Sequence, residues 1–147
     1  MKNRIVIAGS RSFNNYQILL NIMNTQFPEG FPDIVDREGK PHPSVEIISG
    51  AANGVDTLAI QFANRNNLPL STFPADWKTY GFAAGPIRNK QMAEYAALAE
   101  HGILIAIWDG ESRGTANMIR EAKKLNLDVR IFDFNGERSD TNEPQSE

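Results

Sequence analysis

The chain has 147 residues, no cysteine, two histidines and a formal net charge of -3 from 15 basic and 18 acidic side chains. This length fits one domain, which can bury roughly two-thirds of its unfolded surface. The lack of cysteine excludes disulfides, thiol nucleophiles and cysteine-ligated metals, and two histidines argue against a histidine-rich metal site. The hydrophobic content of 41% and the charged content of 22% are typical of a folded, soluble domain.

The first residues do not resemble a targeting signal. Met1–Arg4 is followed at once by the apolar run Ile5–Ala8, which is too short for the core of a signal peptide. No run approaches the roughly 18 apolar residues of a membrane span. We therefore expect a cytoplasmic protein that has no membrane partner.

Short apolar runs alternate along the chain with segments whose apolar residues recur at helical spacing. The runs predict strands at Ile5–Ala8, Val45–Ile48, Leu68–Phe73, Ile103–Trp108 and Val129–Phe134. The spaced segments predict helices at Tyr16–Met23, Asp56–Asn67, Ile87–Glu100 and Gly114–Leu125. Strands that alternate with helices form an α/β fold, and we predict a mainly parallel open sheet of about five strands with helices on both faces.

Two segments do not follow this alternation. Residues 27–43 contain four prolines and two glycines, which predicts a long surface loop or insertion. Residues 135–147 are polar and predict a disordered tail, so residues 1–134 would form the single domain. The tail has four acidic residues and one basic residue, which leaves 14 of each kind in residues 1–134. The net charge of the chain therefore lies in the tail and does not argue against an anionic ligand.

Glycine and polar side chains follow four of the five predicted strands. The carboxyl ends of parallel strands meet at one edge of a sheet, where ligands bind. Glycine lets backbone N–H groups approach a ligand, helix N-termini favour anions, and arginine offers paired donors to phosphate. We therefore predict a site for a phosphate-bearing ligand at this edge. The candidate residues are Gly9, Ser10, Arg11, Ser49, Gly50, Asn53, Gly54, Asp56, Asp76, Trp77, Gly85, Arg88, Asn89, Trp108, Asp109, Gly110, Ser112, Arg113, Gly114 and Thr115.

Each of these features also has a simpler structural explanation. A glycine after a strand is a common turn residue, Ser112 and Thr115 suit helix capping, and Asp56 suits the first turn of a helix. Their coincidence at four strand ends favours the ligand site. The chain lacks the motif of P-loop NTPases, the turn after the first strand departs from the dinucleotide fingerprint, and no acidic cluster has metal-ligand spacing. We therefore predict no cofactor and no metal.

Five segments together resemble the SLOG superfamily, and within it the small YspA-like branch, whose function is unassigned. The resemblance extends over about residues 4–134. It implies a Rossmann-like domain that binds a nucleotide or a nucleotide-derived ligand similar to ADP-ribose, and a homodimer or higher homo-oligomer. The segments are Ile7-Ala8-Gly9-Ser10-Arg11, Ile48-Ser49-Gly50 through Gly54-Val55-Asp56, Phe73-Pro74-Ala75-Asp76-Trp77, Gly85-Pro86-Ile87-Arg88-Asn89, and Trp108-Asp109-Gly110 through Arg113-Gly114-Thr115.

The superfamily includes the Lonely Guy phosphoribohydrolases, which cleave the N-glycosidic bond of nucleoside monophosphates. Arg88 is similar in position to the arginine of these enzymes, but Met118 stands where they have a glutamate. A thioether cannot stabilise the developing positive charge as a carboxylate does. Glu121, one helical turn later, or Asp56 would have to replace that carboxylate in an enzyme. The related Gly-Gly-Ala-Arg turn is Gly50-Ala51-Ala52-Asn53 here, so it lacks one glycine and the arginine.

Three functions follow from these observations. The first is a sensor or sequestering protein that binds a nucleotide-derived ligand without turning it over, and the missing glutamate favours it. The second is a phosphoribohydrolase that uses Arg88 with Glu121 or Asp56 as its catalytic residues. The third is binding of single-stranded nucleic acid, which the absence of a basic stripe in the sequence disfavours. The observations favour binding of a small molecule without turnover, with phosphoribohydrolase activity as the second hypothesis and binding of single-stranded nucleic acid as the third.

Overall fold

The computed structural model describes residues 2–139. Its main sheet has five strands in the order β5-β4-β1-β6-β7, and every neighbouring pair is parallel. The predicted α/β, Rossmann-like class and the mainly parallel open sheet are confirmed. The strands are β1 (Asn3–Gly9), β4 (Val45–Ser49), β5 (Leu70–Thr72), β6 (His101–Ile107) and β7 (Asp128–Phe132).

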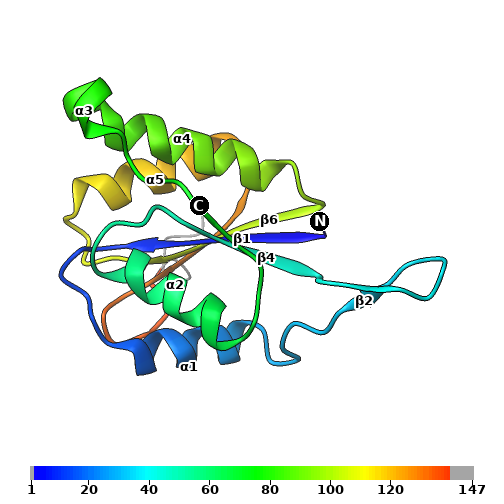
Figure 1. Cartoon of the computed structure of the whole chain (residues 1–147). Coiled ribbons are helices and arrows are strands. Elements are labelled where there is room, and N and C mark those ends of the chain that lie inside the picture. The colour runs from blue at the N-terminus through cyan, green and yellow to red at the C-terminus, as the bar shows by residue number, and fades with distance from the viewer. Residues whose placement is uncertain (1, 140–147) are drawn as a thin grey trace, which may run out of the picture.

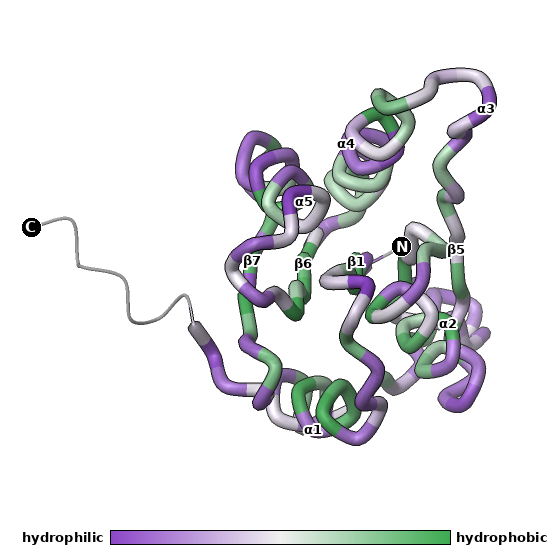
Figure 2. Tube along the Cα trace, turned by 90° about the vertical axis from the view of Figure 1, so that its left-hand side faces the viewer, coloured by the Kyte–Doolittle hydropathy of each residue, from purple (hydrophilic) through white to green (hydrophobic). Residues whose placement is uncertain are grey.

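Helices cover both faces of this sheet, as predicted. Figures 1 and 2 show α1 and α2 on one side of the strands and α4 and α5 on the other. Each helix packs through buried apolar residues that recur at helical spacing, such as Leu19, Ile22 and Met23 in α1. The long helices are α1 (Tyr16–Gln26), α2 (Val55–Arg65), α4 (Ala84–Ala97) and α5 (Arg113–Lys124).

Strand β1 lies at the centre of the sheet because its side chains are apolar in both directions. Ile5 and Ile7 pack into the cluster under α1 and α2, whereas Val6 and Ala8 pack into the cluster under α4 and α5. A continuous apolar run is typical of a parallel strand buried on both faces. The order of the sheet reverses at β1, since the chain passes from β1 to β4 on one side and later returns through β6 on the other. The loops that follow β1 and β6 therefore diverge and leave room for a ligand.

Two short parts of the fold were not predicted. Residues 27–43 include an antiparallel hairpin, β2 (Ile34–Val35) and β3 (Pro41–His42), which projects from the amino ends of the sheet strands (Figure 1). The segment after β5 forms α3 (Trp77–Tyr80) and a 3-10 turn, η1 (Gly81–Ala83). Elements of two to four residues are too short to produce a recognisable periodicity.

The described structure includes residues 135–139, the first part of the predicted tail. The backbone N–H of Ser139 donates to the carbonyl of Ile131 at 2.9 Å, and Phe132 forms a bridge with Arg138. Residues 135–139 therefore turn back along β7. The rest of the predicted tail, residues 140–147, lies outside the described residues. No helix within residues 2–139 is long and apolar enough to cross a membrane.

Candidate functional site

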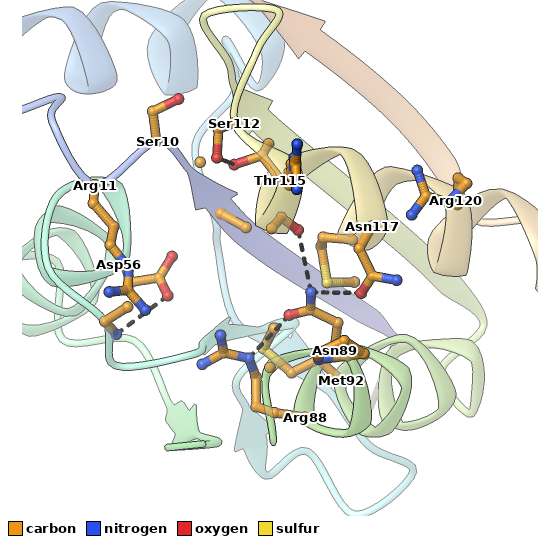
Figure 3. Close-up of a pocket in the computed structure, with 18 of the residues that line it drawn as sticks. Ser10, Arg11, Asp56, Arg88, Asn89, Met92, Ser112, Thr115, Asn117 and Arg120 are labelled. Atoms are coloured by element: carbon orange, nitrogen blue, oxygen red, sulfur yellow. Dashed lines mark hydrogen bonds between the residues drawn. The ribbon is translucent and has the colours of Figure 1, made fainter. Parts of the chain in front are cut away.

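A cavity of about 670 Å³ opens at the carboxyl ends of β1 and β6 (Figure 3). Its walls come from the turn after β1, the start of α2, the start of α3, α4 as far as Met92 and α5 as far as Arg120. Thirteen of the twenty predicted site residues line it. They are Gly9, Ser10, Arg11, Asp56, Trp77, Gly85, Arg88, Asn89, Asp109, Ser112, Arg113, Gly114 and Thr115.

The other seven predicted residues lie outside the lining, and most of them shape the loops around it. The Ser49 hydroxyl donates to the backbone carbonyl of Asp56 at 2.8 Å, which ties the end of β4 to the start of α2. The Asp76 carboxylate accepts the Thr79 N–H and caps α3. The Trp108 indole N–H donates to the carbonyl of Ser112 at 3.0 Å and closes the loop before α5. The remaining four are Gly50, Asn53, Gly54 and Gly110.

Eight lining residues were not predicted. Ala8, Ser12, Ala52 and Pro86 are sequence neighbours of predicted residues, so a wider window around each strand end would have included them. Met92, Asn117, Met118 and Arg120 lie further along α4 and α5 and reach the cavity because these two helices pack side by side. The only sequence signal for these residues is helical spacing. Met92 lies three residues after Asn89 on α4, and Asn117 and Arg120 are three residues apart on α5.

The N-terminus of α5 faces this cavity. Ser112 precedes the helix, but its hydroxyl pairs with the Thr115 hydroxyl at 3.2 Å and makes no hydrogen bond to an N–H of the first turn. The Asp109 carboxylate accepts the backbone N–H groups of Ser112 and Glu111, which lowers the pKa of Asp109 and fixes the loop. The first turn of α5 therefore presents N–H groups without a side-chain cap, and such a terminus attracts anions.

Arg88 is a buried side chain whose guanidinium holds three elements together. Its Nη1 donates to the carbonyl of Gly50 at 2.6 Å and to that of Phe73 at 3.4 Å, and its Nε donates to the Asn89 side chain at 2.9 Å. The Asn89 amide then donates to Asn117 at 2.8 Å (Figure 3). This chain of bonds runs from the end of β4 through α4 to α5, so Arg88 and Asn89 fix the relative positions of the cavity walls.

Asp56 is the one buried carboxylate among the lining residues that the structure describes. Its Oδ2 accepts the backbone N–H of Ala52 at 3.2 Å. Burial raises the pKa of Asp56 to about 6, although the Ala52 N–H and the charges of Arg88 and Arg11 act in the opposite direction. Figure 3 shows the side chain of Arg11 extending towards this carboxyl group. Asp56 can therefore exchange a proton near neutral pH inside the cavity.

Glycines allow the strand ends to approach one another closely around Asp56 and Arg88. A Cβ atom on Gly50 would lie 2.5 Å from Nη1 of Arg88 and 2.8 Å from Oδ2 of Asp56. Gly54 has a φ of +77° and packs against the backbone of Ser10 and Arg11. Ala51 has a φ of 60°, which strains a residue that carries a Cβ.

The charged groups of the cavity favour an anion. Four guanidinium groups line it, on Arg11, Arg88, Arg113 and Arg120, against the carboxylates of Asp56 and Asp109. Arg11, Arg113 and Arg120 are exposed, so they are free to move towards a ligand. No group of three or more His, Asp or Glu side chains within residues 2–139 is arranged to hold a metal ion. The donor set therefore suits phosphate better than a cation.

The structure distinguishes the two carboxylates proposed as replacements for the missing glutamate. Glu121 does not line the cavity, and its Oε2 lies 3.5 Å from Nζ of Lys124 on the same helix. Asp56 does line the cavity. Met118, to which the resemblance to the Lonely Guy enzymes assigns the place of their glutamate, also lines the cavity and is 1% exposed.

Comparison with known proteins gives a family and one distant relative. The model of the YspA, cpYpsA-related SLOG family matches residues 32–80, which include β4, the Gly50–Gly54 turn, α2 and β5. The Gene 61 protein of Mycobacterium phage D29 is 28% identical over 134 residues, which cover 88% of this chain and 95% of the phage protein. No solved structure matches the chain. The family match over residues 32–80 supports the resemblance of the chain to the SLOG superfamily, and the parallel sheet agrees with the Rossmann-like fold that this resemblance implies.

Proposed function

We propose that the protein binds a small nucleotide-derived ligand in this cavity and holds it without cleaving it. The match to the SLOG family over residues 32–80 supports a nucleotide-related ligand in general terms. The observation that carries the proposal is the uncapped N-terminus of α5, which faces a cavity lined by four arginines. The phosphate group would accept N–H groups from the first turn of α5, and Arg113 would pair with it from the same helix.

The proposed role is that of a sensor or a sequestering protein. Cleavage of an N-glycosidic bond requires a group that stabilises positive charge on the sugar, and Met118 cannot do this. A cavity that keeps the phosphate-binding elements but lacks that carboxylate is suited to retain its ligand. The ligand would then leave the site unchanged, or remain bound and withdrawn from its other partners.

Calorimetric titration with adenosine 5′-monophosphate tests the binding. Arg113→Ala should weaken binding by about tenfold or more, because an arginine–phosphate hydrogen bond is among the stronger polar contacts. Arg37→Ala is the matched control, since Arg37 is an exposed arginine that does not line the cavity. Equal affinities for the wild type and Arg113→Ala, or no binding by the wild type, would contradict the proposal.

A second candidate function rests on Asp56. A buried carboxyl group with a pKa near 6 inside the cavity suits general acid catalysis, such as protonation of a leaving base in N-glycosidic cleavage. Incubation with the common nucleoside monophosphates, followed by chromatography, would measure the free base. Base release that Asp56→Asn abolishes would establish the enzyme. The proposed binding function predicts no release by either protein.

A further inference from the structure

Trp77 is a large aromatic residue that lies outside the apolar core. It is 48% exposed, although it lines the cavity at the start of α3. Its ring edge leans on α4, since a Cβ atom on Gly85 would lie 3.4 Å from Cη2 of Trp77. Half of a tryptophan surface left in water is unfavourable unless something else covers it. The indole is therefore supported from one side and open on another.

Arg11 lies over this ring without stacking closely on it. Its guanidinium carbon is 5.9 Å from the centre of the Trp77 ring, whereas that of Arg4 is 3.8 Å from the ring of Tyr95. The Arg4 pair is in direct contact, as in a stacked structural pair. The Arg11 pair lies near the outer limit of a cation–π contact, which extends to about 6 Å from the ring centre. A planar ring stacked between the two groups needs a separation of about 7–8 Å, so an outward shift of Arg11 by about 1–2 Å would admit one.

The two sides of this gap differ in how firmly they are held. Trp77 follows Asp76, which caps α3, and the chain just before it is tied to β4 by the hydrogen bond from the Phe73 N–H to the carbonyl of Ser49 at 2.8 Å. Arg11 is exposed and lies near the carboxyl of Asp56, whose charge attracts it. Trp77 can thus offer a fixed stacking surface, whereas the side chain of Arg11 can move to cover the other face of a bound ring.

We propose that Trp77 and Arg11 form a stacking subsite for the planar heteroaromatic base of a nucleoside phosphate. This inference rests on the proposed function, because it places the phosphate of the same ligand at the N-terminus of α5. Indole and guanidinium planes both stack on bases, and the stacking tolerates different bases because each has a π face. The subsite would make the protein prefer nucleotides over sugar phosphates.

Calorimetry with two probes, adenosine 5′-monophosphate and ribose 5-phosphate, tests this subsite. The wild type should bind the nucleotide about tenfold more tightly than the sugar phosphate, which is the size of effect that loss of one stacked base produces. Trp77→Ala should remove this preference and leave the affinity for ribose 5-phosphate unchanged. Trp77→Phe should restore part of the preference, because phenylalanine retains an aromatic face.

The matched control is Phe82→Ala, since Phe82 lies in the neighbouring turn η1, is fully exposed and does not line the cavity. It should keep the full preference for the nucleotide. A preference that survives Trp77→Ala, with the nucleotide still bound, overturns the stacking subsite and leaves the phosphate site intact. Failure of the wild type to bind either probe overturns the proposed function, and the subsite with it. The exposure of Trp77 predicts that its variants fold, which their melting temperatures will show.

Discussion

The buried carboxyl group of Asp56 should contribute less to the stability of the protein at neutral pH than in mild acid. Its pKa in the folded chain is about 6, above the ordinary value of 3.8. The folded state therefore holds the proton more tightly than the unfolded state does. The contribution of Asp56 to stability is complete below pH 3.8 and is lost as the pH rises through about 6.

The size of this effect follows from the shift in pKa. A difference of about two units corresponds to about 3 kcal/mol, because each unit is worth 1.36 kcal/mol. Asp56→Asn mimics the protonated side chain in shape and keeps an oxygen to accept the Ala52 N–H. The variant should therefore match the wild type near pH 4 and exceed its free energy of unfolding by about 3 kcal/mol near pH 7.5.

Urea denaturation of both proteins at a series of pH values measures this difference. Subtracting one free energy of unfolding from the other cancels the contributions of the titratable groups that the two proteins share. Asp109→Asn provides a control of opposite sign, because hydrogen bonds lower the pKa of Asp109. The stability that Asp109 contributes is present above its unfolded pKa and is lost as the pH falls. Two results would contradict this prediction. One is a difference in free energy of unfolding between Asp56→Asn and the wild type that does not change with pH, and the other is a wild type that is more stable than the variant at pH 7.5.

Further predictions concern the backbone around this carboxyl group. Arg88→Ala should lower the free energy of unfolding by about 3 kcal/mol, because it removes the donor to the carbonyls of Gly50 and Phe73. Urea denaturation measures the loss, and an unchanged midpoint would contradict the structural role of Arg88. Ala51→Gly should stabilise the chain by up to about 1 kcal/mol by relieving its positive φ. Ala52→Gly should destabilise it by about 0.5–1 kcal/mol, and equal shifts in the two melting temperatures would show that Ala51 is not strained.

The sheet and its helices were predictable from the sequence because each strand is a separate apolar run. The edge strand β5 was predicted too long, since Leu68 and Phe73 are apolar but lie outside the ladder. The turn at Ala51 was recognised as a departure from glycine, and its strain became visible only from the backbone angle. The hairpin β2–β3 has two-residue strands, which no periodicity can reveal.

The candidate site was predictable where it follows strand ends and unpredictable where it depends on helix packing. Gly9 ends β1, and Asp109 and Ser112 follow β6, so the parallel topology alone brings them together. Asn117 and Arg120 come from within α5, and they line the cavity because α5 packs beside α4. A sequence motif also cannot show what a guanidinium touches, and Arg88 proved to bond backbone carbonyls as well as to line the cavity.

Amide chemical shifts of ¹⁵N-labelled protein, titrated with adenosine 5′-monophosphate, test the location of the site most directly. The largest changes should occur in the first turn of α5, at residues 113–116, and in the turn after β1, at residues 9–12. A second polar hollow lies near His101 and Arg130, at the amino ends of β6 and β7. Changes confined to that hollow, or no changes anywhere, would contradict the assignment of the ligand site to the carboxyl ends of β1 and β6.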